Sequence, residues 1–122
     1  MLKNNLKVGI ATNNSEECVR KYLSIKGLHK NIPIRGRQPI HPEYMKPNLW
    51  SVKEVLAEMK STSKETVFVG DGINDYICAK KLSMRFIGMG STNRKKSRLE
   101  MINDEIVVVE NYYDIISSLN KI

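Results

Sequence analysis

Residues 67–75 read Val67-Phe68-Val69-Gly70-Asp71-Gly72-Ile73-Asn74-Asp75, and the fold predicted for this chain rests on them. The stretch begins with apolar, β-branched and aromatic residues, which favour a buried strand. The two glycines that follow let the backbone turn sharply and expose Asp71. Asp75 lies four residues further on, where a helix is expected to begin. The stretch therefore predicts a strand, a turn and a helix, with two carboxylates near the carboxyl end of the strand.

Strands and helices are predicted to alternate on both sides of this stretch. The predicted strands cover residues 6–11, 32–34, 66–69, 85–89 and 106–109. Helices are expected after Asn14 or Ser15, from Pro47, after Gly72 and after Asn111, on the evidence of capping residues and apolar periodicity. Such alternation predicts an α/β fold with three layers, in which helices cover both faces of a Rossmann-like parallel sheet. We expect a single domain over residues 1–122.

Apolar periodicity also predicts which side chains are buried. In the first helix the apolar side is formed by Val19, Tyr22, Leu23 and Ile25. In the helix after Gly72 it is formed by Ile73, Ile77, Cys78 and Leu82. Both cysteines, Cys18 and Cys78, fall in helical stretches, and we expect them to be reduced and buried in a cytoplasmic protein.

The chain is basic, with a net charge of +7 and a pI near 9.5. This charge is compatible with an anionic partner. The densest basic cluster, residues 94–98, has no interleaved aromatic residues, so nucleic acid is an unlikely partner and an exposed loop or helix start is the preferred interpretation. The sequence has no run of 18 apolar residues and no secretory signal, so we expect no membrane span.

Two polar clusters follow predicted strands, where ligands bind in open α/β sheets. The cluster at Thr12 and Asn13 offers a hydroxyl and backbone N–H groups at a helix start, which suit a phosphate group. Asp71 and Asp75 could share a hard cation such as Mg²⁺. Taken alone, the first cluster is more typical of a helix cap and the second of a turn.

The longer pattern resembles the haloacid dehalogenase superfamily. Residues 67–75 are similar to its fourth motif, an apolar strand ending in G-D-G-x-N-D. Met45-Lys46-Pro47-Asn48 resembles the third motif, and Val8-Gly9-Ile10-Ala11-Thr12-Asn13 resembles the second. Residues 80–89 are similar to the next helix and strand of the family. The motifs occur in the family's order and cover nearly the whole chain.

The resemblance implies a phosphate monoester hydrolase that uses Mg²⁺ and an aspartyl-phosphate intermediate. Asp71 and Asp75 would be the magnesium ligands. Lys46 would be a catalytic residue that neutralises charge on the phosphoryl group, and Thr12 and the backbone N–H of Asn13 would hold phosphoryl oxygens. These roles suit phosphoryl transfer, which depends mainly on positioning and charge stabilisation. The expected substrate is a small phosphorylated metabolite.

The family's first motif, D-x-D-x-T/V, is not found in these residues. Its two aspartates act as nucleophile and general acid/base, whereas the aspartates of this chain, Asp71, Asp75, Asp104 and Asp114, do not form D-x-D. We therefore expect this chain alone to be inactive. In the family the first-motif strand lies between the strands that end at Thr12 and Asp71. Its loss predicts direct closure of the sheet, a homo-oligomer, or a partner chain that completes the sheet. No cap domain fits between the second and third motifs.

Three interpretations remain open. The chain is part of a phosphatase, completed by residues elsewhere; or a non-catalytic module of the same fold that binds Mg²⁺, phosphate or a protein partner; or another doubly wound domain, such as a receiver-like or flavodoxin-like one. The third is disfavoured because residues 6–14 lack the acidic cluster that a receiver needs at its first strand.

Overall fold

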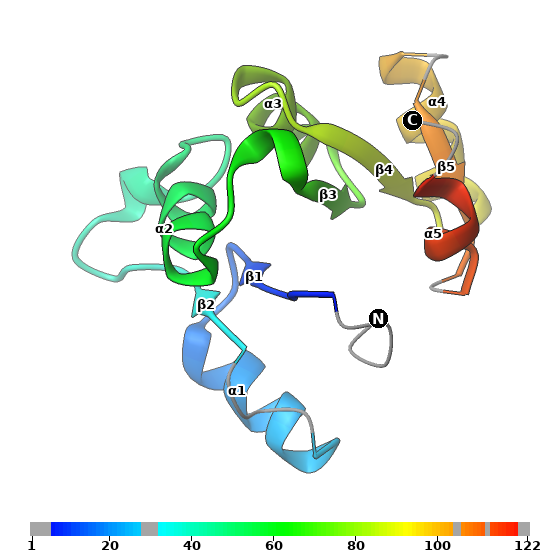
Figure 1. Ribbon diagram of the computed structural model, residues 1–122. Coiled ribbons are helices and arrows are strands. Elements are labelled where there is room, and N and C mark those ends of the chain that lie inside the picture. The colour runs from blue at the N-terminus through cyan, green and yellow to red at the C-terminus, as the bar shows by residue number, and fades with distance from the viewer. Residues whose placement is uncertain (1–5, 28–31, 104–105, 112, 120–122) are drawn as a thin grey trace. The chain divides into compact units, whose positions relative to one another are not determined.

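A computed structural model describes residues 6–27, 32–103, 106–111 and 113–119 of the protein. The chain forms two compact units, residues 1–62 and 63–122, which we call the first unit and the second unit. Each unit is an α/β structure built on parallel strands, as the alternation of elements predicted (Figure 1). The prediction of a single domain stays a prediction.

The first unit contains a parallel pair of short strands and two longer helices. Its elements are β1 (Ile10–Ala11), α1 (Glu16–Ile25), β2 (Ile34–Arg35), the 3₁₀ turn η2 (Pro42–Tyr44) and α2 (Trp50–Met59). Ile10 lies opposite Ile34, and Ala11 opposite Arg35. The pairing is extended by the N–H of Thr12, which donates to the carbonyl oxygen of Arg35 at 3.0 Å.

Helix α2 packs closely on this strand pair. Val52 and Val55 of α2 are buried, and Ile34 of β2 is fully buried. A Cβ at Gly9 would lie 2.4 Å from the Cγ1 of Val55 and 2.5 Å from the Sδ of Met59. Gly9 therefore allows the helix to approach the backbone just before β1.

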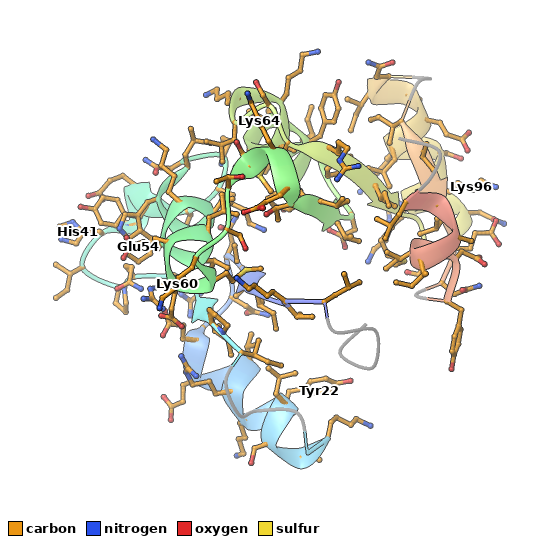
Figure 2. All side chains as sticks on the ribbon, viewed as in Figure 1. Tyr22, His41, Glu54, Lys60, Lys64 and Lys96 are labelled. Carbon is orange, nitrogen blue, oxygen red and sulfur yellow. The ribbon has the colours of Figure 1, made fainter. Side chains whose placement is uncertain are left out.

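Helix α1 begins and ends as predicted, but its apolar side is only partly covered: Val19 and Leu23 are half-buried, and Tyr22 and Ile25 are exposed. Ser15 is the N-cap and accepts from the N–H of Cys18, and Gly27, with a φ of 71°, follows the helix end. None of the residues of α1, which the structure describes in full, is buried. Tyr22 is 61% exposed and Ile25 is 75% exposed. The side chain of Tyr22 is labelled in Figure 2. Cys18 is exposed as well, so its predicted burial was wrong.

The second unit holds a three-stranded parallel sheet in the order β3-β4-β5. After the 3₁₀ turn η3 (Ser63–Glu65), its elements are β3 (Val67–Gly70), α3 (Ile73–Lys81), β4 (Arg85–Met89), α4 (Asn93–Ile102), β5 (Val107–Val109) and α5 (Tyr113–Ser118). Gly70 pairs with Gly88, and Met89 with Val109. The carboxyl ends of these strands therefore lie at the same edge of the sheet.

Successive residues of the strands point to opposite faces of this sheet, and helices pack on both faces. On one face, an apolar cluster joins the sheet to α5; it contains Ile87, Met89, Val109 and Ile115, with Val67, Val69 and Leu119 packed against it. The opposite face carries Phe86 and Gly88. There the ring centroids of Phe86 and Tyr76, a residue of α3, are 5.5 Å apart, and a Cβ at Gly88 would lie 3.0 Å from the Cδ1 of Leu99 in α4. The second unit thus has the three predicted layers.

Several predicted boundaries move in the structure. Strand β1 begins at Ile10 rather than at residue 6, and β2 begins at Ile34 because Pro33 has no N–H to pair. Strands β3 and β5 begin one residue later than predicted. Helix α2 begins at Trp50, because the side chain of Asn48 accepts from the N–H of Trp50 and holds a turn after Pro47.

In the second unit, one of the alternatives predicted for the basic stretch is confirmed and one prediction of burial is corrected. Residues 94–98 form the first part of helix α4, and all but Lys96 are exposed, as expected for a helix start. In α3 the buried side is formed by Asp75, Cys78 and Ala79, whereas Ile73 is 54% exposed. No helix in the described parts of the chain is long and apolar enough to cross a membrane.

Candidate functional site

The first unit brings the predicted phosphate-binding residues together at the end of β1. Thr12 follows the strand directly, and its Oγ1 accepts from the N–H of Asn14 at 3.0 Å. This hydrogen bond fixes the tight turn that leads into α1. The predicted second motif therefore forms a compact polar loop at a strand end.

Asn13 joins this loop to the segment that carries Lys46. The Oδ1 of Asn13 accepts from the N–H of Lys46 at 2.7 Å, and its Nδ2 donates to the Lys46 carbonyl oxygen at 3.2 Å. One amide side chain thus holds both sides of one residue that lies 33 positions away. This role of the Asn13 side chain was not predicted, because only its backbone N–H was expected to bind phosphoryl oxygens.

The side chain of Lys46 returns to the end of β1. Its Nζ donates to the carbonyl oxygen of Ala11 at 2.9 Å. The ammonium group is therefore held beside Thr12, at the carboxyl end of the strand, where ligands bind in open α/β sheets. Thr12, Asn13 and Lys46, predicted from separate motifs, form one cluster in the first unit.

The loop after β2 also packs on this cluster. The N–H of Gly36 donates to the Oε1 of Glu16 at 3.0 Å, and the N–H of Arg37 donates to the Asn14 carbonyl oxygen at 2.8 Å. A Cβ at Gly36 would lie 2.5 Å from that same carbonyl oxygen. The turn at Asn14 is thus fixed from the β2 side as well.

The second unit brings the two predicted metal ligands together. Asp71 follows β3, and Asp75 is the third residue of α3. The Oδ2 of Asp75 accepts from the N–H of Asp71 at 3.1 Å. A Cβ at Gly70 would lie 2.4 Å from the Cβ of Asp75, so the absence of a side chain at Gly70 lets the two carboxylates approach.

This pair offers hard oxygen donors of the kind that Mg²⁺ prefers. Asp75 is largely buried, while the side chain of Asp71 is 52% exposed and accessible. Among the residues that the structure describes, no group of three or more His, Cys, Asp or Glu side chains could hold a metal ion. Mg²⁺ commonly keeps several waters and shares substrate phosphates with one or two carboxylates, so the pair fits part of such a site.

A second lysine contacts the carboxylate pair, and this contact was not predicted from the sequence. The Nζ of Lys95, in the first turn of α4, lies 3.0 Å from the Oδ2 of Asp71. The basic cluster at residues 94–98 was interpreted as solvent-exposed. A usable signal was present: the cluster follows a strand adjacent to β3, and neighbouring parallel strands bring their following loops together.

The predicted residues therefore form two clusters, one in each unit. Thr12, Asn13 and Lys46 belong to the first unit, and Asp71 and Asp75 belong to the second. A family model described as a haloacid dehalogenase-like hydrolase matches residues 1–89, which include both clusters. The match ends with β4 and does not reach Lys95. No curated protein matches the chain.

Proposed function

The chain belongs to the haloacid dehalogenase-like hydrolases, and on this premise we propose that it supplies the phosphate-binding and magnesium-binding parts of a site that hydrolyses phosphate monoesters. The observation that carries the proposal is the fixed position of Lys46. The side chain of Asn13 forms hydrogen bonds with the backbone N–H and carbonyl oxygen of Lys46, and the carbonyl oxygen of Ala11 accepts a hydrogen bond from its ammonium group. A positioned cation at a strand end suits a phosphoryl group, whose transfer depends on charge stabilisation.

Each residue of the first cluster has a separate task in this proposal. Lys46 neutralises negative charge on the phosphoryl oxygens. The hydroxyl of Thr12 and the N–H of Asn13 donate to those oxygens and orient the group. Asn13 also forms hydrogen bonds with the backbone of Lys46. The residues that orient the phosphoryl group are therefore fixed relative to the residue that neutralises its charge.

Asp71 and Asp75 would hold Mg²⁺ in the second cluster. When bound, this ion would neutralise phosphate charge and help to orient the substrate. The N–H of Asp71 donates to Asp75, so the backbone at the strand end orients one carboxylate relative to the other. The substrate class we propose is a small phosphorylated metabolite.

The nucleophile must come from residues outside the two clusters. The 122 residues contain no D-x-D motif, so we propose that the two aspartates of that motif are supplied by another segment, a second copy or a partner chain. Two sheet edges could accept the strand that carries them. In the described residues, β1 pairs with β2 and β3 pairs with β4, and both strands lie at an edge of their sheets.

The hydrogen bonds of β1 indicate which of its groups remain for such a strand. Ile10 and Thr12 donate to the β2 side, so the peptide groups of Ala11 point to the opposite edge. Lys46 reaches the carbonyl oxygen of Ala11 at that edge. An added strand beside β1 would therefore bring its own carboxyl end close to the ammonium group of Lys46. The edge strand of a sheet can act as a template for pairing with another strand.

Phosphate binding tests the first part of the proposal. Binding of inorganic phosphate in the presence of Mg²⁺ can be measured by calorimetry for the wild-type chain, Lys46→Met and Lys53→Met. Lys53 is an exposed residue of α2, so its substitution makes the same change in net charge outside the cluster. We expect Lys46→Met to weaken binding at least tenfold and Lys53→Met to leave it nearly unchanged. Equal effects of the two substitutions would contradict the role of Lys46.

Complementation tests the second part. A synthetic peptide with an apolar strand followed by D-x-D-x-T is added to the chain, and hydrolysis of an aryl phosphate is measured with Mg²⁺. The matched control peptide carries N-x-N in place of D-x-D. We expect turnover only with the aspartate peptide, and none with the chain alone. Phosphate binding without turnover in every mixture would favour the alternative function, a non-catalytic module that binds Mg²⁺, phosphate or a protein partner.

The proposed compartment is the cytoplasm. Cys18 and Cys78 are not joined by a disulfide. Cysteines outside disulfides are typical of a reducing compartment.

A further inference from the structure

Lys95 forms an ion pair with the carboxylate proposed to hold Mg²⁺. Its Nζ lies 3.0 Å from the Oδ2 of Asp71, and the two residues are 24 positions apart in the chain. Both side chains are about half exposed, at 46% for Lys95 and 52% for Asp71. The ammonium group of Lys95 thus binds an oxygen of Asp71 that would otherwise be available to a metal cation.

Packing fixes the helix from which Lys95 extends. Leu99, one turn further along α4, is fully buried against the sheet. At the helix start, a Cβ at Gly90 would lie 2.8 Å from the Cα of Lys96, so the first turn of α4 rests directly on the end of β4. The Oγ1 of Thr92 accepts from the N–H of Lys95 at 3.2 Å. The backbone of Lys95 is therefore held beside the loop that contains Asp71.

The position of Lys95 within its helix is electrostatically unfavourable by itself. The first turn of α4 contains Arg94, Lys95 and Lys96, and this turn, which the structure describes in full, has no acidic residue. The N-terminal end of a helix carries a partial positive charge, which repels cations. Each lysine is compensated from another element: Lys95 by Asp71, and Lys96 by Glu110 at 3.1 Å. The positive charge of Lys95 is therefore compensated by the carboxylate of Asp71 rather than by its own helix.

We propose that Lys95 is a built-in counter-ion of Asp71 that competes with the metal and thereby sets the affinity of the second cluster for Mg²⁺. This inference rests on the proposed function, because it takes Asp71 as a ligand of the metal. In the metal-free protein the ammonium group neutralises the Asp71 carboxylate. Binding of a divalent cation to that carboxylate requires Lys95 to withdraw, and the withdrawn ammonium group faces both the cation and the helix N-terminus. Metal affinity is therefore lower than two carboxylates alone would give.

Lys96 provides a matched control on the same helix. It lies one position further on, its pKa is raised by its hydrogen bond with Glu110, and it forms an ion pair with that residue. Figure 2 shows Lys96 extending from α4. Substitution of Lys95 or Lys96 by methionine removes one positive charge from the first turn of α4. A difference between the two variants therefore isolates direct competition at Asp71 from the general loss of positive charge.

The experiment measures metal binding directly and does not depend on catalysis. Mn²⁺ is titrated as a probe for the magnesium site, and broadening of the amide NMR signals of residues 70–75 reports occupancy. The proteins are the wild-type chain, Lys95→Met, Lys96→Met, Lys95→Arg and Asp71→Asn. An ion pair this exposed is weak, so we expect Lys95→Met to bind Mn²⁺ about two- to fivefold more tightly than Lys96→Met. Lys95→Arg should remain close to the wild type.

Salt provides a second signature. Because the competition is ionic and exposed, the ratio of affinities between Lys95→Met and Lys96→Met should shrink towards one as ionic strength rises to about 1 M. A structural change caused by the loss of Lys95 packing would leave the ratio unchanged.

The possible outcomes separate this inference from the proposed function. Tighter binding by Lys95→Met, with little change in Lys96→Met, supports it. Equal affinities of the two variants, weaker binding by Lys95→Met, or no binding by either one overturn it. If Asp71→Asn abolishes binding while the two lysine variants are equal, only the role of Lys95 fails. If Asp71→Asn binds Mn²⁺ as the wild type does, the metal assignment in the proposed function fails as well.

Discussion

The side chain of Asn13 forms hydrogen bonds with both backbone groups of Lys46. The Asn13 Oδ1 accepts from the backbone nitrogen of Lys46 at 2.7 Å, and the Asn13 Nδ2 donates to the Lys46 carbonyl oxygen at 3.2 Å. The amide of asparagine offers an acceptor and a donor side by side, and a backbone residue offers the complementary pair. Two segments that are far apart in the sequence are thereby fixed at the end of β1.

Substitution of Asn13 should weaken both the fold of the first unit and its binding of phosphate. Asn13→Ala leaves two part-buried backbone groups of Lys46 without this partner, which should cost about 1–3 kcal/mol of unfolding free energy. Asn13→Asp keeps the acceptor and loses the donor, so an intermediate loss is expected. Urea denaturation measures the stability, and calorimetry with inorganic phosphate measures the affinity. Wild-type stability in Asn13→Ala would mean that the two hydrogen bonds contribute little.

The close approach at Gly70 should make a single added methyl group harmful. A Cβ there would lie 2.4 Å from the Cβ of Asp75, which forces α3 or β3 to shift. We expect Gly70→Ala to reduce stability by about 1–3 kcal/mol and to weaken Mn²⁺ binding. Gly72→Ala is the control, because a Cβ at Gly72 would meet no atom of the described residues within 4 Å. Its cost should stay below about 1 kcal/mol, mainly from the N-cap preference. Similar losses in the two variants would contradict this account.

Leu99 is expected to hold α4 against the sheet. It is fully buried, so Leu99→Ala should lower the unfolding free energy by about 2–5 kcal/mol. Met101, on the same helix, is 85% exposed, and Met101→Ala should change stability by less than about 0.5 kcal/mol. Thermal or urea denaturation with circular dichroism compares the two. Equal stabilities would show that α4 contributes little packing to the second unit.

The carboxylate of Glu43 should make a small, pH-dependent contribution to stability. Hydrogen bonds from its own backbone N–H and from His41 hold the pKa of Glu43 below its ordinary value of 4.5. A lowered pKa in the folded state means that this contribution is present above pH 4.5 and is lost as the pH falls through the folded pKa. Glu43→Gln should therefore melt slightly below the wild type at pH 7, and the difference should disappear in acid.

Melting temperatures measured across a series of pH values check this prediction. His41→Gln, which removes the side-chain partner but keeps the backbone one, should retain part of the effect. A difference between the wild type and Glu43→Gln that grows as the pH falls would contradict the sign of the prediction.

Local chemistry explains which parts of the structure could be predicted from the sequence. Strand β4 was predicted with its observed bounds, because Phe86, Ile87 and Met89 form a short apolar segment typical of a buried strand. The turn at Gly70 to Asp75 was predicted for a similar reason: glycines and carboxylates at fixed spacing follow a strand. At Asn111, the predicted cap is confirmed by its hydrogen bond to the N–H of Asp114.

The parts that could not be predicted depend on contacts between distant segments. Helix α4 has a capping residue, Thr92, but cations rather than acidic residues occupy its first turn, and Leu99 is its buried residue. The role of the Asn13 side chain requires knowledge of where Lys46 lies. The exposure of Tyr22 and Ile25 has the same origin, because periodicity indicates which side of a helix is apolar but not whether another element covers it.

The glycines at the carboxyl ends of β3 and β4 affect how a mutational scan of this protein should be interpreted. Gly70 and Gly88 are paired across the two strands, and α3 and α4 press on them through Asp75 and Leu99. Alanine scanning normally asks what is lost when a side chain is shortened. At these two positions it adds bulk instead, so loss of function would identify space that must stay empty rather than a group that performs chemistry.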